Sequence, residues 1–195
     1  MTQGQDRLKV MVVIASTRPS RVGLSVGTWI RGLVESDPGW DLTVADLKEL
    51  DLPMMNEPKH PRFKEYQYDH TKRWSEMVDA QDAFIFVFPE YNHGMTAPLK
   101  NAIDYLSQEW GHKPVGLVSY GGVSAGLRAT QQVKTVVAAL KMMPLSEAVT
   151  IPSVSDQVKD GVFVPTESAT GAAGVMLAQL RRWADAMKPL RTGQL

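Results

Sequence analysis

Short apolar runs alternate with longer amphipathic segments five times along this chain of 195 residues, and this pattern constrains the fold more than any other feature. We predict strands in the apolar runs, at residues 10–15, 42–46, 83–88, 114–119 and 148–151. Helices are predicted in the amphipathic segments, at residues 21–36, 71–80, 97–106, 125–141 and 167–187. Strands that alternate with helices form a parallel sheet with helices on both faces.

The number of strand-helix units selects among such sheets. Five units favour the flavodoxin-like, doubly wound strand order 2-1-3-4-5 over the larger dinucleotide-binding sheet. The run at residues 42–46 alternates apolar and polar residues, so we place it nearer a sheet edge. Without repeats or a linker, the chain is predicted to form a single domain over residues 1–195. Residues 52–69, rich in proline and charge, are predicted to be a loop that is functional or covers an interface.

Composition excludes several classes of function. Lys plus Arg and Asp plus Glu number 21 each, which argues against a general nucleic-acid or membrane-surface partner, so any anion site must be local. The chain has no cysteine, which excludes disulfides, thiolate metal sites and catalytic thiols. Its four histidines lack metal-ligand spacing, and we expect no metal. Residues 1–9 lack the apolar core of a signal peptide, and a cytoplasmic location is expected.

The loop after the first predicted strand has the composition of a phosphate site. It reads Ser16-Thr17-Arg18-Pro19-Ser20-Arg21-Val22-Gly23 and opens directly into a helix. A helix N-terminus offers unpaired N–H groups, hydroxyls add donors, and arginine binds phosphate oxygens in pairs. We predict that this loop binds a phosphate monoester. The alternative is that Ser16 or Ser20 merely caps the helix while both arginines face solvent.

The loop after the third predicted strand suits a flat molecule with polar edges. It carries Pro89, Glu90, Tyr91, Asn92, His93 and Gly94. Tyr91 is expected along an aromatic ligand and Asn92 at its edge, whereas Glu90 is expected to brace the loop through backbone N–H groups. His93 has either a titrating role or one in shape and hydrogen bonding. The alternative is a plain turn in which Asn92 and Gly94 are left-handed.

The loop after the fourth predicted strand contains paired glycines. Its sequence is Ser119-Tyr120-Gly121-Gly122, and Gly126 follows at the start of a helix. Glycine pairs permit unusual dihedral angles and a close approach of backbone to ligand. In a parallel sheet, the loops after the first, third and fourth strands emerge at one edge, where ligands bind; they are called the first, second and third loops below. A plain strand-to-helix turn is the alternative.

Together these three segments resemble the NADPH-dependent FMN reductase family, a flavodoxin-like group that includes quinone, azo-dye and chromate reductases. The resemblance spans nearly the whole chain and is most specific at Pro89-Glu90-Tyr91-Asn92 with Leu99-Lys100-Asn101-Ala102-Ile103-Asp104. It implies that the FMN phosphate is held by Ser16, Arg18, Val22 and Gly23, with Ser20 and Arg21. It places the isoalloxazine between residues 89–92 and residues 119–122, with backbone groups of Gly94, Gly121 and Gly122 near its N1–O2 edge. It implies no role for His93.

The resemblance also implies an activity. A hydride would pass from NADPH or NADH through FMN to a quinone-like, azo or other small acceptor, with no catalytic side chain, in a homodimer or homotetramer. Two other classes remain open: a one-electron flavodoxin-type carrier, and a non-catalytic flavin-binding sensor or interaction protein. A phosphate-binding hydrolase is disfavoured because the chain shows no cluster of nucleophile or metal ligands.

Overall fold

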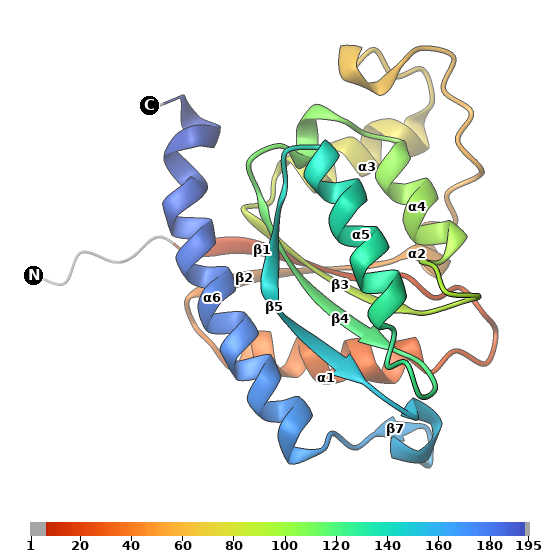
Figure 1. Cartoon of the computed structure of the whole chain (residues 1–195). Coiled ribbons are helices and arrows are strands. Elements are labelled where there is room, and N and C mark those ends of the chain that lie inside the picture. Colours follow the sequence, from red (N-terminus) through yellow and green to blue (C-terminus); the bar gives the residue numbers. More distant parts are fainter. Residues whose placement is uncertain (1–6, 194–195) are drawn as a thin grey trace, which may run out of the picture.

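The computed structural model describes residues 7–193, and its centre is a five-stranded parallel sheet (Figure 1). The strands are β1 (Leu8–Ile14), β2 (Trp40–Asp46), β3 (Ala83–Pro89), β4 (Pro114–Tyr120) and β5 (Met143–Ile151). They run in the order β2-β1-β3-β4-β5. The predicted flavodoxin-like order is therefore confirmed, and β2 lies at an edge as predicted.

Six helices connect and follow these strands in the described residues. They are α1 (Gly23–Glu35), α2 (Leu47–Leu50), α3 (Asp69–Asp79), α4 (Ala97–Asp104), α5 (Leu127–Ala139) and α6 (Glu167–Thr192). Single 3-10 turns form at η1 (Pro61–Phe63), η2 (Gln108–Trp110) and η3 (Val154–Gln157), and β6 (Val158–Lys159) pairs antiparallel with β7 (Val162–Phe163). No helix between residues 7 and 193 is both long and apolar enough to cross a membrane.

Strand alternation divides the apolar side chains into two layers. Val10, Val12 and Ile14 of β1 pack with α1 and α6, while Met11 and Val13 face the opposite layer with α3, α4 and α5. Figure 1 shows α6 and α1 on one side of the sheet and the other three long helices on the opposite side. The central strands are buried on both faces, which explains why their sequences are continuously apolar.

Two boundaries differ clearly from prediction. β5 begins at Met143 rather than at residue 148; the apolar pattern misses its first half because that half includes Pro144, Ser146 and Glu147. The register of β4 against β5 also shifts between Val115 and Leu117. α6 continues to Thr192 despite Pro189, and it ends where Gly193 takes a left-handed φ of 67°.

The long segment predicted as a loop, residues 52–69, is mostly loop but is tied to the helices beneath it. The Tyr105 hydroxyl and the Asn101 amide donate to the Pro53 carbonyl at 3.0 and 2.7 Å. Farther along, the Tyr66 hydroxyl donates at 2.7 Å to Glu109, a fully buried carboxylate that also accepts from Ser75. The segment is therefore a fixed surface rather than a loose connection.

Candidate functional site

The loops after β1, β3 and β4 meet at the carboxyl edge of the sheet and enclose a cavity of about 310 Å³. This is the edge at which open parallel sheets bind ligands. Ten predicted site residues line the cavity: Ser16, Arg18, Ser20, Arg21, Val22, Pro89, Glu90, Tyr91, Tyr120 and Gly121. The other predicted residues lie outside the lining: Gly23, Asn92, His93, Gly94, Ser119 and Gly122.

The two arginines of the first loop have different surroundings. The Arg21 guanidinium pairs with the Asp46 carboxylate at 2.5 Å and donates to the Ser16 carbonyl at 2.9 Å. Its side chain is only 6% exposed. Arg18 is exposed and has no carboxylate partner among residues 7–193; its guanidinium carbon lies 5.9 Å from the centre of the Tyr91 ring. Arg18 is therefore the cation available to a ligand, while Arg21 fixes the shape of the loop.

The N-terminus of α1 lacks a side-chain cap. Its N-cap residue is Val22, and no side chain accepts a hydrogen bond from its first turn, which also contains no acidic residue. The alternative in which Ser16 or Ser20 caps this helix is therefore wrong. An uncapped helix N-terminus beside two hydroxyls and an unpaired arginine is chemically suited to a phosphate dianion.

The second loop forms a tight two-residue hairpin. The N–H groups of Tyr91 and Gly94 each donate to the other residue's carbonyl, at 3.0 and 2.9 Å. Asn92 and His93 between them are left-handed, with φ of 49° and 68°. The plain-turn alternative is therefore right about a left-handed Asn92 but wrong about Gly94, since His93 is the second left-handed residue. Asn92 and His93 are exposed at the tip of the hairpin.

Tyr91 links the second loop to the first. Its hydroxyl lies 3.4 Å from the Ser16 Oγ, and its ring, 37% exposed, lies beside Arg18. An aromatic side chain from the loop after β3 thus lies over the hydroxyl and beside the cation of the first loop. The arrangement places a flat apolar surface directly next to an anion site.

Glu90 holds the second and third loops together. Its carboxylate, 6% exposed, accepts hydrogen bonds from Ser124 Oγ at 2.9 Å and from the Arg128 N–H at 3.0 Å. It also accepts from the Arg128 guanidinium and the Ala129 N–H at 2.9 and 3.3 Å. These partners include the first turn of α5, so the prediction that Glu90 braces the loop is confirmed.

We expect Glu90→Gln to lower the free energy of unfolding at pH 7 by about 1–2 kcal/mol, because its charge-assisted hydrogen bonds are lost. Burial acts to raise the pKa of Glu90, but the hydrogen bonds outweigh it and the pKa lies below 4.5. A lowered pKa gives stability that is present above the unfolded-state pKa and disappears as pH falls through the folded-state value. Denaturant titrations of both proteins should therefore converge below about pH 4.5; a gap that widens on acidification would contradict this assignment.

The third loop is hydrogen-bonded to residues 153–154, a segment that the sequence analysis did not include in the site. The Gly122 and Gly121 carbonyls accept from the Ser153 and Val154 N–H groups, at 3.0 and 3.1 Å. Val154 and Ser155 consequently line the cavity as well. The position of these residues in the chain could have indicated this, because the turn that follows β5 must emerge at the same edge of the parallel sheet as the three loops.

Two backbone donors expected to face the ligand are already engaged. The Gly121 N–H donates to the Ile151 carbonyl at 3.2 Å, and the Gly94 N–H donates within its hairpin. Ser119 is fully buried, and its Oγ donates to the Ala125 carbonyl at 2.9 Å. The N–H groups of Gly94 and Gly121 are therefore not free donors, and the expectation that other backbone groups of these two loops face the ligand stays a prediction.

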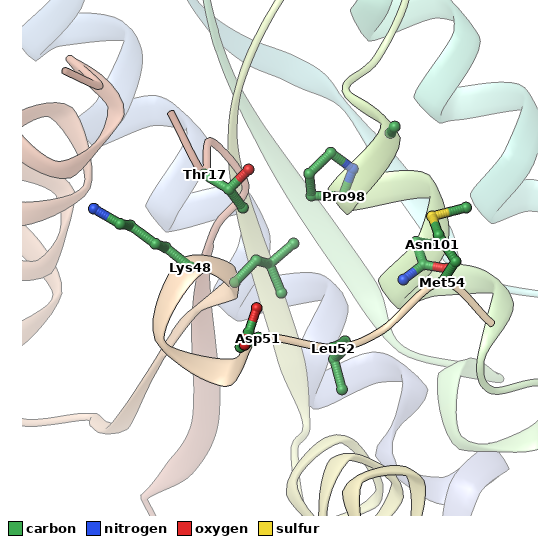
Figure 2. A pocket seen from close by; sticks show the side chains of 9 residues that line it. Thr17, Lys48, Asp51, Leu52, Met54, Pro98 and Asn101 are labelled. Atoms are coloured by element: carbon green, nitrogen blue, oxygen red, sulfur yellow. The ribbon is translucent and has the colours of Figure 1, made fainter. Parts of the chain in front are cut away.

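A second cavity, of about 370 Å³, lies on the other side of the first loop (Figure 2). Thr17 and Lys48 lie on one side of it, with Pro98 and Asn101 of α4 on the other. Thr17 is therefore separated from Ser16 and Ser20, its neighbours in the first loop, which face the smaller cavity. Although it is larger and includes the start of α4, this cavity is lined by no arginine and no aromatic side chain.

The strand order and the site define a class: a flavodoxin-like fold whose carboxyl edge has a cavity suited in chemistry to a mononucleotide. The model of the NADPH-dependent FMN reductase family matches residues 8–156. An NAD(P)H-dependent FMN reductase of Schizosaccharomyces pombe is 36% identical over 170 residues, which are 85% of this chain and 84% of the relative. The chain belongs to the NADPH-dependent FMN reductase family. It is therefore an oxidoreductase with FMN as its cofactor.

Two further comparisons show the range of similar proteins. An NAD(P)H:quinone oxidoreductase of Solanum tuberosum is 31% identical over 108 residues, covering 52% of this chain and 56% of the relative. Among solved structures, the flavoenzyme NAD(P)H:(acceptor) oxidoreductase FerB from Paracoccus denitrificans superposes with a TM-score of 0.73 at 21% identity. The superposition covers 92% of this chain and 98% of FerB, and at this identity it shows the fold alone.

Proposed function

We propose that this chain transfers electrons from NADPH or NADH, through FMN in the cavity of about 310 Å³, to a quinone-like or azo acceptor. The observation that carries the proposal is the combination of Arg18 and the uncapped start of α1 with the adjacent Tyr91 ring. Arg18 and the start of α1 suit a phosphate, and the Tyr91 ring suits a flat ring system. The quinone oxidoreductase among its relatives supports the class of acceptor.

Different residues of this chain would hold different parts of the cofactor. Ser16, Ser20 and Arg18 would bind the phosphate, together with the first-turn N–H groups of α1. Glu90 keeps Tyr91 and the third loop in fixed positions through the start of α5. FMN, when bound, supplies the two-electron redox chemistry between a reduced nicotinamide and an acceptor. The described residues need only hold it with one face accessible.

The proposal extends to assembly: the protein works as a homodimer or homotetramer. Several large apolar side chains are exposed on the fixed segment 52–69, including Met54 at 73% and Phe63 at 53%. Exposed apolar side chains on a rigid surface favour association. Light scattering after gel filtration should give a mass above that of the 21.6 kDa chain.

The direct test is the visible spectrum of the purified protein incubated with FMN. We expect bound flavin, bleaching on anaerobic addition of NADPH or NADH, and return of the colour when a quinone is added. Steady nicotinamide consumption with a quinone distinguishes this enzyme from a sensor or a one-electron carrier. A folded protein that binds no FMN would rule out the proposal.

A further inference from the structure

Tyr120 is the one polar side chain of the cavity lining that is both deeply buried and without a hydrogen-bond partner within residues 7–193. The residue is 4% exposed, and its hydroxyl oxygen is fully covered. An unpaired buried hydroxyl destabilises a folded protein by about 1–3 kcal/mol. Such an atom is expected where a ligand later supplies the partner.

The hydroxyl lies beneath the first loop. A Cβ added to Gly23, the first residue of α1, would meet the Tyr120 oxygen at 2.2 Å and the Ser16 Cβ at 3.2 Å. The missing side chain of Gly23 therefore creates the space that the hydroxyl occupies. Although Tyr120 ends β4, its hydroxyl lies next to Gly23 at the uncapped start of α1.

The surroundings keep this hydroxyl a donor. Burial raises the pKa of Tyr120. The neighbouring Ser16 hydroxyl, which forms no hydrogen bond of normal geometry with the Tyr120 hydroxyl, lowers that pKa by less, so the phenol stays protonated at physiological pH. Tyr91 stands close by and covers the same corner of the cavity through its contact with Ser16. The corner thus holds a neutral O–H donor, a serine hydroxyl and an uncapped helix end.

We propose that the Tyr120 hydroxyl donates a hydrogen bond to the phosphate group of the bound mononucleotide, and so helps to select FMN over unphosphorylated riboflavin. The inference rests on the proposed function, because it requires FMN in this cavity. It differs from what the family resemblance implies, which puts residues 119–122 beside the ring system. In this proposal the aromatic ring of Tyr120 only positions the hydroxyl, and the hydroxyl donates the hydrogen bond to the phosphate.

The test compares FMN and riboflavin binding to the apo-proteins of the wild type and of Tyr120→Phe, measured by quenching of flavin fluorescence. Loss of one hydrogen bond to a charged group predicts FMN binding weakened about ten- to a hundredfold, with riboflavin binding little changed. The thermal unfolding temperature of the apo-variant should equal or exceed that of the wild type, because an unpaired buried oxygen is removed.

Tyr105→Phe is the matched control. It removes a buried tyrosine hydroxyl that does have partners, the Pro53 carbonyl at 3.0 Å and Asn56 Oδ1 at 3.2 Å, on the other side of the sheet. We expect this variant to unfold at a lower temperature and to keep the wild-type ratio of FMN to riboflavin affinity. The two Tyr→Phe changes should thus have opposite signatures.

A second pair of variants tests the geometry without any ligand. Gly23→Ala should destabilise the wild type by displacing the Tyr120 oxygen, and Tyr120→Phe should relieve much of that loss, because the nearest ring carbon is 3.2 Å away. The inference is overturned if Tyr120→Phe weakens both flavins equally, or neither. If the wild type itself binds no flavin, the proposed function fails first.

Discussion

Replacing Asp46 with alanine is expected to lower the free energy of unfolding by about 3–5 kcal/mol, because the buried Arg21 guanidinium would lose its counter-charge. The two side chains of this ion pair are only 6% and 14% exposed. Asp46 also accepts a hydrogen bond from the Lys48 N–H at 3.0 Å, which caps α2. Arg21 also donates to the Ser16 carbonyl of the first loop, so the phosphate site should be disturbed as well.

Urea unfolding followed by circular dichroism measures this effect. The control is Glu35→Ala, which breaks the exposed pair with Arg31 and should change stability by at most about 0.5 kcal/mol. Asp46→Asn keeps an acceptor for Lys48 and should fall between the two variants, which leaves a measurable protein if the alanine variant does not fold. Equal losses in Asp46→Ala and Glu35→Ala would show that the Arg21 pair is energetically unimportant.

Replacing Arg18 with alanine is expected to weaken FMN binding a hundred- to a thousandfold, about 3–4 kcal/mol, without destabilising the apo-protein. Arg18 is exposed and contacts only the Tyr91 ring face among the interactions described for its side chain. Two charge-assisted bonds to a phosphate would be lost, so riboflavin should bind almost as before. Lysine at this position should restore only part of the affinity, since it lacks the planar pair of donors.

Arg62→Ala provides the control for Arg18. Arg62 is also exposed and lies over an aromatic ring, with 4.6 Å between its guanidinium carbon and the centre of Phe63, but it does not line the cavity. Calorimetric titration with FMN should give the wild-type affinity for this variant. If Arg18→Ala also kept an affinity within a fewfold of the wild type, the phosphate would have to bind elsewhere.

The fold was predictable because its strands are buried on both faces and therefore read as uninterrupted apolar runs. β3 and β4 begin at the predicted residues, Ala83 and Pro114, and end one residue later. The start of β5 was missed where Pro144 interrupts the apolar pattern. Whether residues 1–195 form one domain stays a prediction, as do the cytoplasmic location and the oligomeric state.

The loops that form the site were predictable from the sequence, but the roles of individual residues in these loops were less so. The bracing role of Glu90 followed from its position after a strand and ahead of polar residues. The engagement of Arg21 did not, because its partner Asp46 is 25 positions away in the chain and adjacent only in the folded sheet. Likewise, Val154 and Ser155 reach the cavity because the N–H groups of Ser153 and Val154 donate to the third loop, which no local pattern reveals.

The anchoring of the segment 52–69 has a consequence for proteolysis. A proline-rich connection of this length would ordinarily be an early target, since proteases need several residues of extended, mobile backbone. Here Asn101, Tyr105 and Glu109 hold the backbone or side chains of the segment from below. Trypsin should therefore cut after Lys59 or Arg62 only as fast as the helices beneath them open, so that digestion reports the opening of α3 and α4 rather than the accessibility of a loop.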